Sequence, residues 1–124
     1  MKKNREVILL VDDEFIILQS AQRLLEKKGY QVLTATNGRR AMDVLKDNKD
    51  NIGVILLDLS MPGMDGEETL EKLLEIDPTA QIILFSGYSV TKDMASLFKK
   101  GAIGHIQKPF DIKGLLAKID ETLR

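Results

Sequence analysis

The sequence predicts one α/β domain built on a five-stranded parallel sheet with helices on both faces. Three observations support this prediction. The length of 124 residues suits a single domain, five short apolar runs alternate with segments of helical periodicity, and the connections between them are short. Such alternation is typical of a doubly wound parallel sheet, because each crossover returns over one face of the sheet. We expect the domain to span residues 1–124.

The apolar runs are expected to form the strands, because short apolar segments between polar or turn-forming residues are typical of buried strands. The expected strands are 7–11, 31–35, 54–57, 82–85 and 102–106. The third run leads directly into Asp58 and then into a loop with Pro and Gly. An isolated Asp can simply start a turn. At the carboxyl end of a buried strand, however, Asp58 would stand where open α/β sheets bind ligands.

The segments between the strands carry apolar residues at helical spacing, which predicts five amphipathic helices. The apolar stripes are Ile17, Ala21, Leu24 and Leu25 in 14–28, then Ala41, Val44 and Leu45, then Leu70, Leu73 and Leu74, then Val90, Met94, Leu97 and Phe98, and finally Ile112, Leu115, Leu116, Ile119 and Leu123. The second helix is expected to end near Asn48 and the third at Asp77, before Pro78. Asp111 is the expected N-cap of the fifth.

Lys-Lys-Gly occurs twice, at 27–29 and 99–101. Cations followed by Gly are typical of helix C-termini, because the cations complement the helix dipole and Gly adopts the conformation that ends the helix. We therefore interpret both triplets as helix ends rather than as basic patches.

Composition excludes several classes of function. The net charge of −1 gives no reason to expect direct nucleic-acid binding. The absence of cysteine excludes disulfides and thiolate metal sites and suits a reducing cytoplasm. No segment has the pattern of a signal peptide or the length of a membrane span. We expect a cytoplasmic protein without a membrane partner.

Chemically active side chains gather at the predicted strand ends. Asp12 and Asp13 follow the first strand, Asp58 the third, Ser86 the fourth, and Lys108 the fifth. In the strand order 2-1-3-4-5 these four strands are neighbours, so the side chains would share one edge of the sheet. Three carboxylates together repel one another unless a cation lies among them. A ligand set of oxygens predicts a hard metal such as Mg²⁺, and a hydroxyl and an ammonium facing it would complete a phosphoryl-binding site.

These residues belong to four motifs, each at the carboxyl end of a predicted strand. The motifs are VDDE at 11–14, DLSMPGMDG at 58–66, SGYS at 86–89 and KPF at 108–110. With them, essentially the whole chain closely resembles the receiver domain of two-component response regulators. The resemblance implies a flavodoxin-like sheet in the order 2-1-3-4-5. It also implies a signalling protein that catalyses only its own aspartyl phosphorylation and dephosphorylation.

The resemblance assigns roles in phosphoryl transfer. Asp58 resembles the phosphoacceptor, which takes its phosphoryl group from a sensor histidine kinase or a histidine phosphotransfer protein. Ser86 would hydrogen-bond a phosphoryl oxygen, and Lys108 would neutralise it. The family also implies a cis peptide bond between Lys108 and Pro109. Transfer of this kind depends mainly on positioning and charge stabilisation, which such a site provides.

The resemblance also implies how Mg²⁺ would be held. By this resemblance, Asp13 would bind the ion directly beside Asp58, and Asp12 would bind it through a water molecule. The backbone carbonyl of Ser60 would be the third protein ligand.

Two positions near the predicted site, His105 and Tyr88, call for a separate interpretation. The family usually has Tyr or Phe three residues before the lysine, as a ring that swings inward on activation, but this chain has His105. His105 is either an edge residue without a switching role or a smaller planar switch that responds to pH. Tyr88 lies two residues beyond Ser86. It would either shield the acyl phosphate and obstruct donors, or be a partly exposed loop aromatic.

The expected response to phosphorylation is a change at the face formed by the fourth helix, fifth strand and fifth helix. Its partner would be an output domain, a downstream protein or a second copy in a homodimer. Apolar residues of the last two helices could belong to this surface or to the core. One alternative is an aspartyl-phosphate phosphatase like the haloacid dehalogenase enzymes, but these need an acid where Ser60 stands. Another is a phosphate-independent interaction module, in which the site would be eroded.

Overall fold

The computed structural model describes residues 6–59, 61, 65–86, 92–108 and 111–123. Within these residues, five strands alternate with five helices, as the sequence predicts. The strands are β1 Val7–Val11, β2 Gln31–Ala35, β3 Ile52–Asp58, β4 Ile82–Ser86 and β5 Gly104–Gln107. The helices are α1 Phe15–Lys27, α2 Gly38–Asn48, α3 Gly66–Ile76, α4 Lys92–Lys100 and α5 Ile112–Leu123. Within the described residues, no helix is both long and apolar enough to span a membrane.

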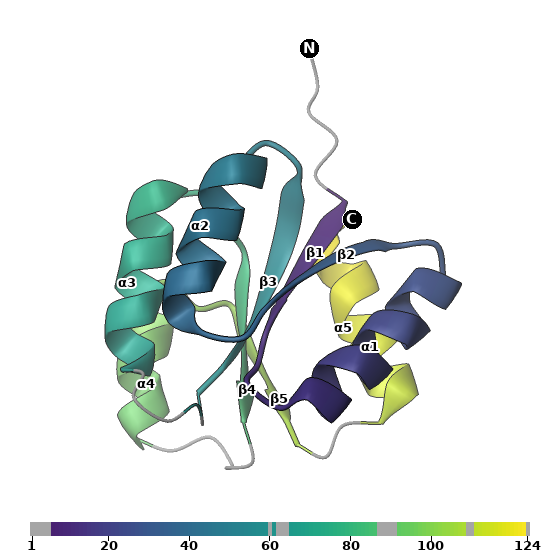
Figure 1. Cartoon of the computed structure of the whole chain (residues 1–124). Coiled ribbons are helices and arrows are strands. Elements are labelled where there is room, and N and C mark those ends of the chain that lie inside the picture. The colour runs from purple at the N-terminus through teal and green to yellow at the C-terminus, as the bar shows by residue number, and fades with distance from the viewer. Residues whose placement is uncertain (1–5, 60, 62–64, 87–91, 109–110, 124) are drawn as a thin grey trace.

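The strands form one parallel sheet in the order β2-β1-β3-β4-β5, which confirms the predicted fold class. Helices α2, α3 and α4 cover one face of this sheet, and α1 and α5 cover the other (Figure 1). The order places β1, β3 and β4 next to one another. Their carboxyl ends therefore meet at one edge.

Among the described residues, two hydrophobic clusters fix the sheet between its helix layers. Alternate residues of β1 enter opposite clusters, because successive side chains of a strand point to opposite faces. Leu9 packs in the cluster with α2 and α3, whereas Leu10 packs in the cluster with α1 and α5. Every residue of β3 is buried, including its last residue, Asp58. Packing on both faces therefore holds the strand that delivers this acid.

The predicted helix ends are confirmed by backbone geometry. Gly29 and Gly101 have φ of +97° and +130°, the left-handed conformation that ends a helix. The Lys-Lys-Gly triplets are thus helix ends. At the start of α5, the side chain of Asp111 accepts a hydrogen bond from the N–H of Gly114 at 2.6 Å, so Asp111 is the N-cap.

Several element bounds and buried faces differ from the predictions. The fifth strand begins at Gly104 rather than at residue 102, because the N–H of Ala102 bonds the carbonyl of Leu97 and closes the end of α4. Strand β3 begins two residues earlier than predicted, at Ile52. In α1 the buried residues are Leu18, Ala21 and Leu25. The predicted stripe members Ile17 and Leu24 are only half-buried.

Candidate functional site

The acid residues stand where two neighbouring strands end. Asp12 follows β1, and its N–H bonds the carbonyl of Ala35, which continues the pairing with β2 by one residue. Asp58 is the last residue of β3. Both side chains are buried, whereas that of Asp13 is exposed. The short buried strands therefore carry two carboxylates to one place and leave the third open to solvent.

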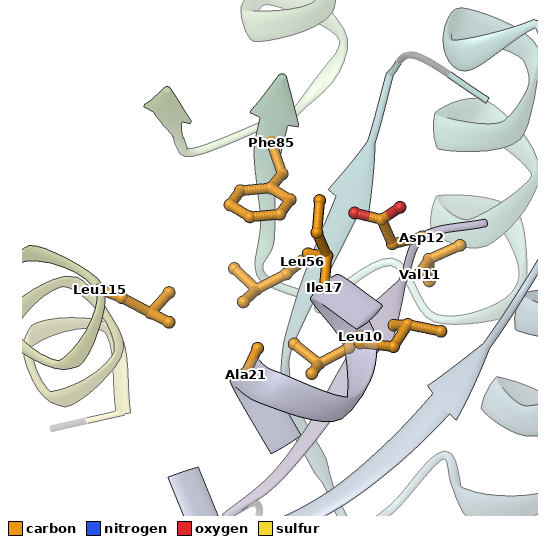
Figure 2. A pocket seen from close by; sticks show the side chains of 9 residues that line it. Leu10, Val11, Asp12, Ile17, Ala21, Leu56, Phe85 and Leu115 are labelled. Atoms are coloured by element: carbon orange, nitrogen blue, oxygen red, sulfur yellow. The ribbon is translucent and has the colours of Figure 1, made fainter. Parts of the chain in front are cut away.

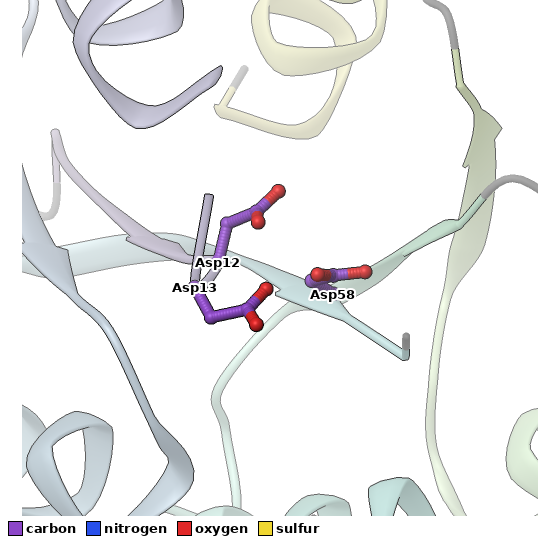
Figure 3. Close-up of side chains that lie close together, drawn as sticks. All are labelled: Asp12, Asp13 and Asp58. Atoms are coloured by element: carbon purple, nitrogen blue, oxygen red, sulfur yellow. The ribbon is translucent and has the colours of Figure 1, made fainter. Parts of the chain in front are cut away.

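These carboxylates approach one another closely. Asp12, Asp13 and Asp58 each offer an oxygen within 4.8 Å of the others (Figure 3). Carboxylate oxygens at this spacing, two of them from buried residues, suit a hard divalent cation such as Mg²⁺. The predicted metal ligands from these three residues are thus brought together. The predicted carbonyl ligand of Ser60 lies outside the described residues.

Lys108 supplies positive charge to this cluster. Its Nζ lies 2.8 Å from Asp12 Oδ2 and 3.4 Å from Asp58 Oδ2. The side chain is only 12% exposed, and Nζ lies 4.9 Å from the centre of the Phe85 ring. Burial lowers the pKa of Lys108, but the hydrogen bond to Asp12 and the charges of Asp12 and Asp58 outweigh it, so the pKa is raised. The ammonium therefore stays charged at neutral pH.

The backbone holds Lys108 in this position. It directly follows β5, and its N–H bonds the carbonyl of Ser86 at 2.6 Å. Pro109 and the predicted cis bond lie outside the described residues, as does Tyr88.

Ser86 and His105 contact each other across neighbouring strands. Ser86 is the last residue of β4 and is fully buried. Its Oγ lies 2.9 Å from Nε2 of the His105 ring, on β5. Burial lowers the pKa of His105, which favours the neutral ring at physiological pH. The side chain that replaces the family aromatic is therefore in direct contact with the serine of the site.

Sequence reasoning missed two residues that contact Lys108. One is Phe85, whose ring lies beneath the ammonium. The other is Glu14, whose Oε1 lies 3.6 Å from Lys108 Nζ. The sequence did contain an indication of Glu14, because it is the third acid of the VDDE motif. No sequence pattern distinguished Phe85 from the other apolar residues of its strand.

A small, mainly apolar cavity of about 10 Å³ is lined in part by Asp12 (Figure 2). Its lining comes from α1, α5 and the sheet, and includes Ala21, Leu56, Phe85 and Leu115. This volume is about enough for one water molecule. The cavity is too small for a phosphodonor or a cofactor.

Comparison with known proteins supports a relationship over nearly the whole chain. The sequence profile of the response regulator receiver domain matches residues 8–120. The chain is 36% identical over 107 residues to sporulation initiation phosphotransferase F of Bacillus subtilis, covering 86% of this chain and 85% of that protein.

Solved structures show the same fold. A receiver domain protein (CheY-like) from Methanospirillum hungatei JF-1 is 33% identical with a TM-score of 0.85, and the match covers 95% of this chain and 93% of that chain. The CheX–CheY–BeF₃–Mg²⁺ complex from Borrelia burgdorferi is 28% identical with a TM-score of 0.88, covering 95% and 89%.

Proposed function

Because this chain belongs to the response regulator receiver domain family, we propose that Asp58 is its phosphoacceptor. Receiver domains are signalling modules of two-component systems, and that is the function of this chain. The proposed donor is a phosphohistidine on a sensor histidine kinase or a histidine phosphotransfer protein. We expect the two proteins to meet in the cytoplasm.

The proposed reaction moves one phosphoryl group. A carboxylate oxygen of Asp58 attacks phosphorus, the phosphorus–nitrogen bond to the donor imidazole breaks, and the imidazole leaves as it takes up a proton. Lys108 Nζ is 3.4 Å from Asp58 Oδ2, so a small movement would bring it against a phosphoryl oxygen. The domain turns over no separate metabolite in this proposal.

The three carboxylates would hold a Mg²⁺ ion. We propose Asp13 and Asp58 as direct ligands, Asp12 as a ligand through water, and the carbonyl of Ser60 as a further ligand. When bound, the ion would supply positive charge opposite the phosphoryl oxygens. Asp13 is exposed and so leaves this side of the cluster accessible.

One observation carries the proposal: a fully buried Asp58 lies among other carboxylates and next to a buried lysine. Such a cluster has a high electrostatic cost unless a cation joins it. A phosphate-independent module would have no need of it. An aspartyl-phosphate phosphatase would need an acid two residues after Asp58, where Ser60 stands.

We propose that Ser86 and His105 carry the response to phosphorylation. A phosphoryl oxygen on Asp58 would be a charged acceptor for the Ser86 hydroxyl, and charged acceptors form stronger hydrogen bonds than neutral ones. Ser86 would then leave His105, which lies on β5. Coupling of about 1–3 kcal/mol is typical of such two-state changes.

The surface that would change consists of α4, β5 and α5. Ile103, immediately before β5, is 49% exposed. An output domain, a downstream protein or a second copy of this chain is the proposed partner. We propose no direct contact with nucleic acid by this domain.

Beryllofluoride, a mimic of the phosphoryl group, tests this proposal. With Mg²⁺ it should shift the NMR signals of Asp58, Ser86 and Lys108 amides and of the His105 ring. Asp58→Asn should show none of these shifts. Ser86→Ala should bind the mimic but leave the His105 ring signals unchanged. If the native chain fails to bind with Mg²⁺ present, the phosphate-independent module is the better description.

A further inference from the structure

Glu14 carries an exposed charge at the mouth of the site, beside Lys108. It is the residue before α1, and its N–H bonds Asp12 Oδ1 at 2.9 Å. Its own side chain makes no capping hydrogen bond. The side chain is 60% exposed, and its Oε1 lies 3.6 Å from Lys108 Nζ. Glu14 therefore faces the charged group that would contact an incoming phosphoryl group.

The three described acids that contact Lys108 differ in burial and in distance. Asp12 and Asp58 are buried and belong to the cluster that suits a metal ion. Within the described residues, Glu14 is not part of that cluster. A cation bound by the aspartates would thus leave the Glu14 charge at the rim. This charge attracts Lys108 outward and repels any anion that approaches Asp58.

Resting on the function proposed above, we propose that Glu14 determines which phosphodonors this domain accepts, by suppressing phosphorylation by small free anions. An acyl phosphate carries two negative charges at neutral pH and has only its own contacts to offset the repulsion. A donor protein has a whole interface to offset it. Glu14 therefore lowers phosphorylation by metabolites more than phosphorylation by a protein. It is a specificity residue that acts through its field and through Lys108.

Donors of different charge distinguish an electrostatic role of Glu14 from a purely structural one. Phosphorylation rates would be measured with Mg²⁺ for acetyl phosphate, a dianion, and phosphoramidate, a monoanion. Glu14→Gln should become phosphorylated by acetyl phosphate about two- to fivefold faster than the native chain. An increase of this size is expected when an exposed charge a few ångströms from the donor is removed. The gain should be smaller with phosphoramidate. It should shrink at about 1 M salt, where exposed charges are screened within a few ångströms.

Two matched variants complete the test. Glu14→Asp keeps the charge and should stay close to the native rate with acetyl phosphate. Glu26→Gln removes another exposed acid, from the far end of α1, and should change neither rate. Loss of a favourable charge from the α1 N-terminus would lower stability, but it would not depend on donor charge.

The outcomes distinguish this inference from the function on which it rests. A gain with Glu14→Gln that depends on donor charge and salt supports the inference. Equal rates for Glu14→Gln and the native chain, or an equal gain with both donors, overturn it while the phosphoacceptor role stands. If no variant and no native chain takes up a phosphoryl group, both are overturned.

Discussion

At the scale of single residues, the balance of charge at the site depends on Lys108. Its ammonium lies within 4 Å of carboxylates from Asp12, Glu14 and Asp58. Asp13 adds a further negative charge to the same cluster. Four acids around one cation leave an excess of negative charge, and two of the acids are buried. Such an excess of negative charge suits the binding of a divalent cation.

Removing the ammonium tests this balance. Lys108→Met should lower the free energy of unfolding by about 1–3 kcal/mol in the presence of a chelator, because Asp12 and Asp58 lose their buried counter-charge. Millimolar Mg²⁺ should restore most of the loss. Urea unfolding with and without Mg²⁺ measures both effects. Lys46→Met, on the exposed side of α2, is the control. A loss that Mg²⁺ does not reduce would argue against a cation site at the aspartates.

His105 should make the stability of the folded chain depend on pH, with stability falling as the pH falls. Burial holds its pKa below the ordinary value of 6.5, so in the window between the two values the unfolded chain binds more protons than the folded chain. The contribution of His105 to the free energy of unfolding is therefore fully present above about pH 6.5. It is lost as the pH falls through the lower pKa of His105 in the folded chain. No ion pair joins His105 to a charged group among the described residues, although Lys118 of α5 lies beside the neighbouring Gly104.

Unfolding in urea at about pH 7.5 and about pH 5.5 measures this dependence. The native chain should lose more stability over this range than His105→Gln, which cannot titrate there. Equal losses in the two proteins would show that His105 makes no contribution.

At the scale of elements, two glycines end helices under different constraints. Gly29 and Gly101 both have positive φ, but a Cβ at Gly29 would meet open space. A Cβ at Gly101 would come within 2.8 Å of Leu74 Cδ1, on α3. Gly29→Ala should cost about 1 kcal/mol from backbone strain alone. Gly101→Ala should cost about 0.5–1 kcal/mol more, because Leu74 must move.

Thermal or urea unfolding of the two variants checks this difference. Equal destabilisation would show that Leu74 adjusts without cost and that α4 is not held against α3 at this point.

Element bounds could be predicted where local signals decide them, and not where a tertiary bond decides them. The run of VILLV gives β1 its bounds, since polar residues flank it on both sides. The start of β5 depends instead on the bond from Ala102 to Leu97 that closes α4. The face of α1 was predicted less well, because Ile17 and Leu18 are equally apolar and only packing against the sheet selects Leu18.

At the scale of the whole molecule, the doubly wound order explains why distant motifs form one site. Strand order brings β1, β3 and β4 together, so Asp12, Asp58 and Ser86 reach the same edge. This much follows from residue types and their place after predicted strands. The contacts of Glu14 and Phe85 with Lys108, and that of His105 with Ser86, depend on side-chain direction and could not be predicted from spacing.

The most direct test of the phosphoacceptor role of Asp58 is intact-mass spectrometry after incubation with acetyl phosphate. It would compare the native chain and Asp58→Asn, each with and without Mg²⁺. We expect one phosphoryl adduct on the native chain that requires Mg²⁺ and is absent from Asp58→Asn. An adduct of equal yield on Asp58→Asn, or one that forms equally well without Mg²⁺, would contradict it.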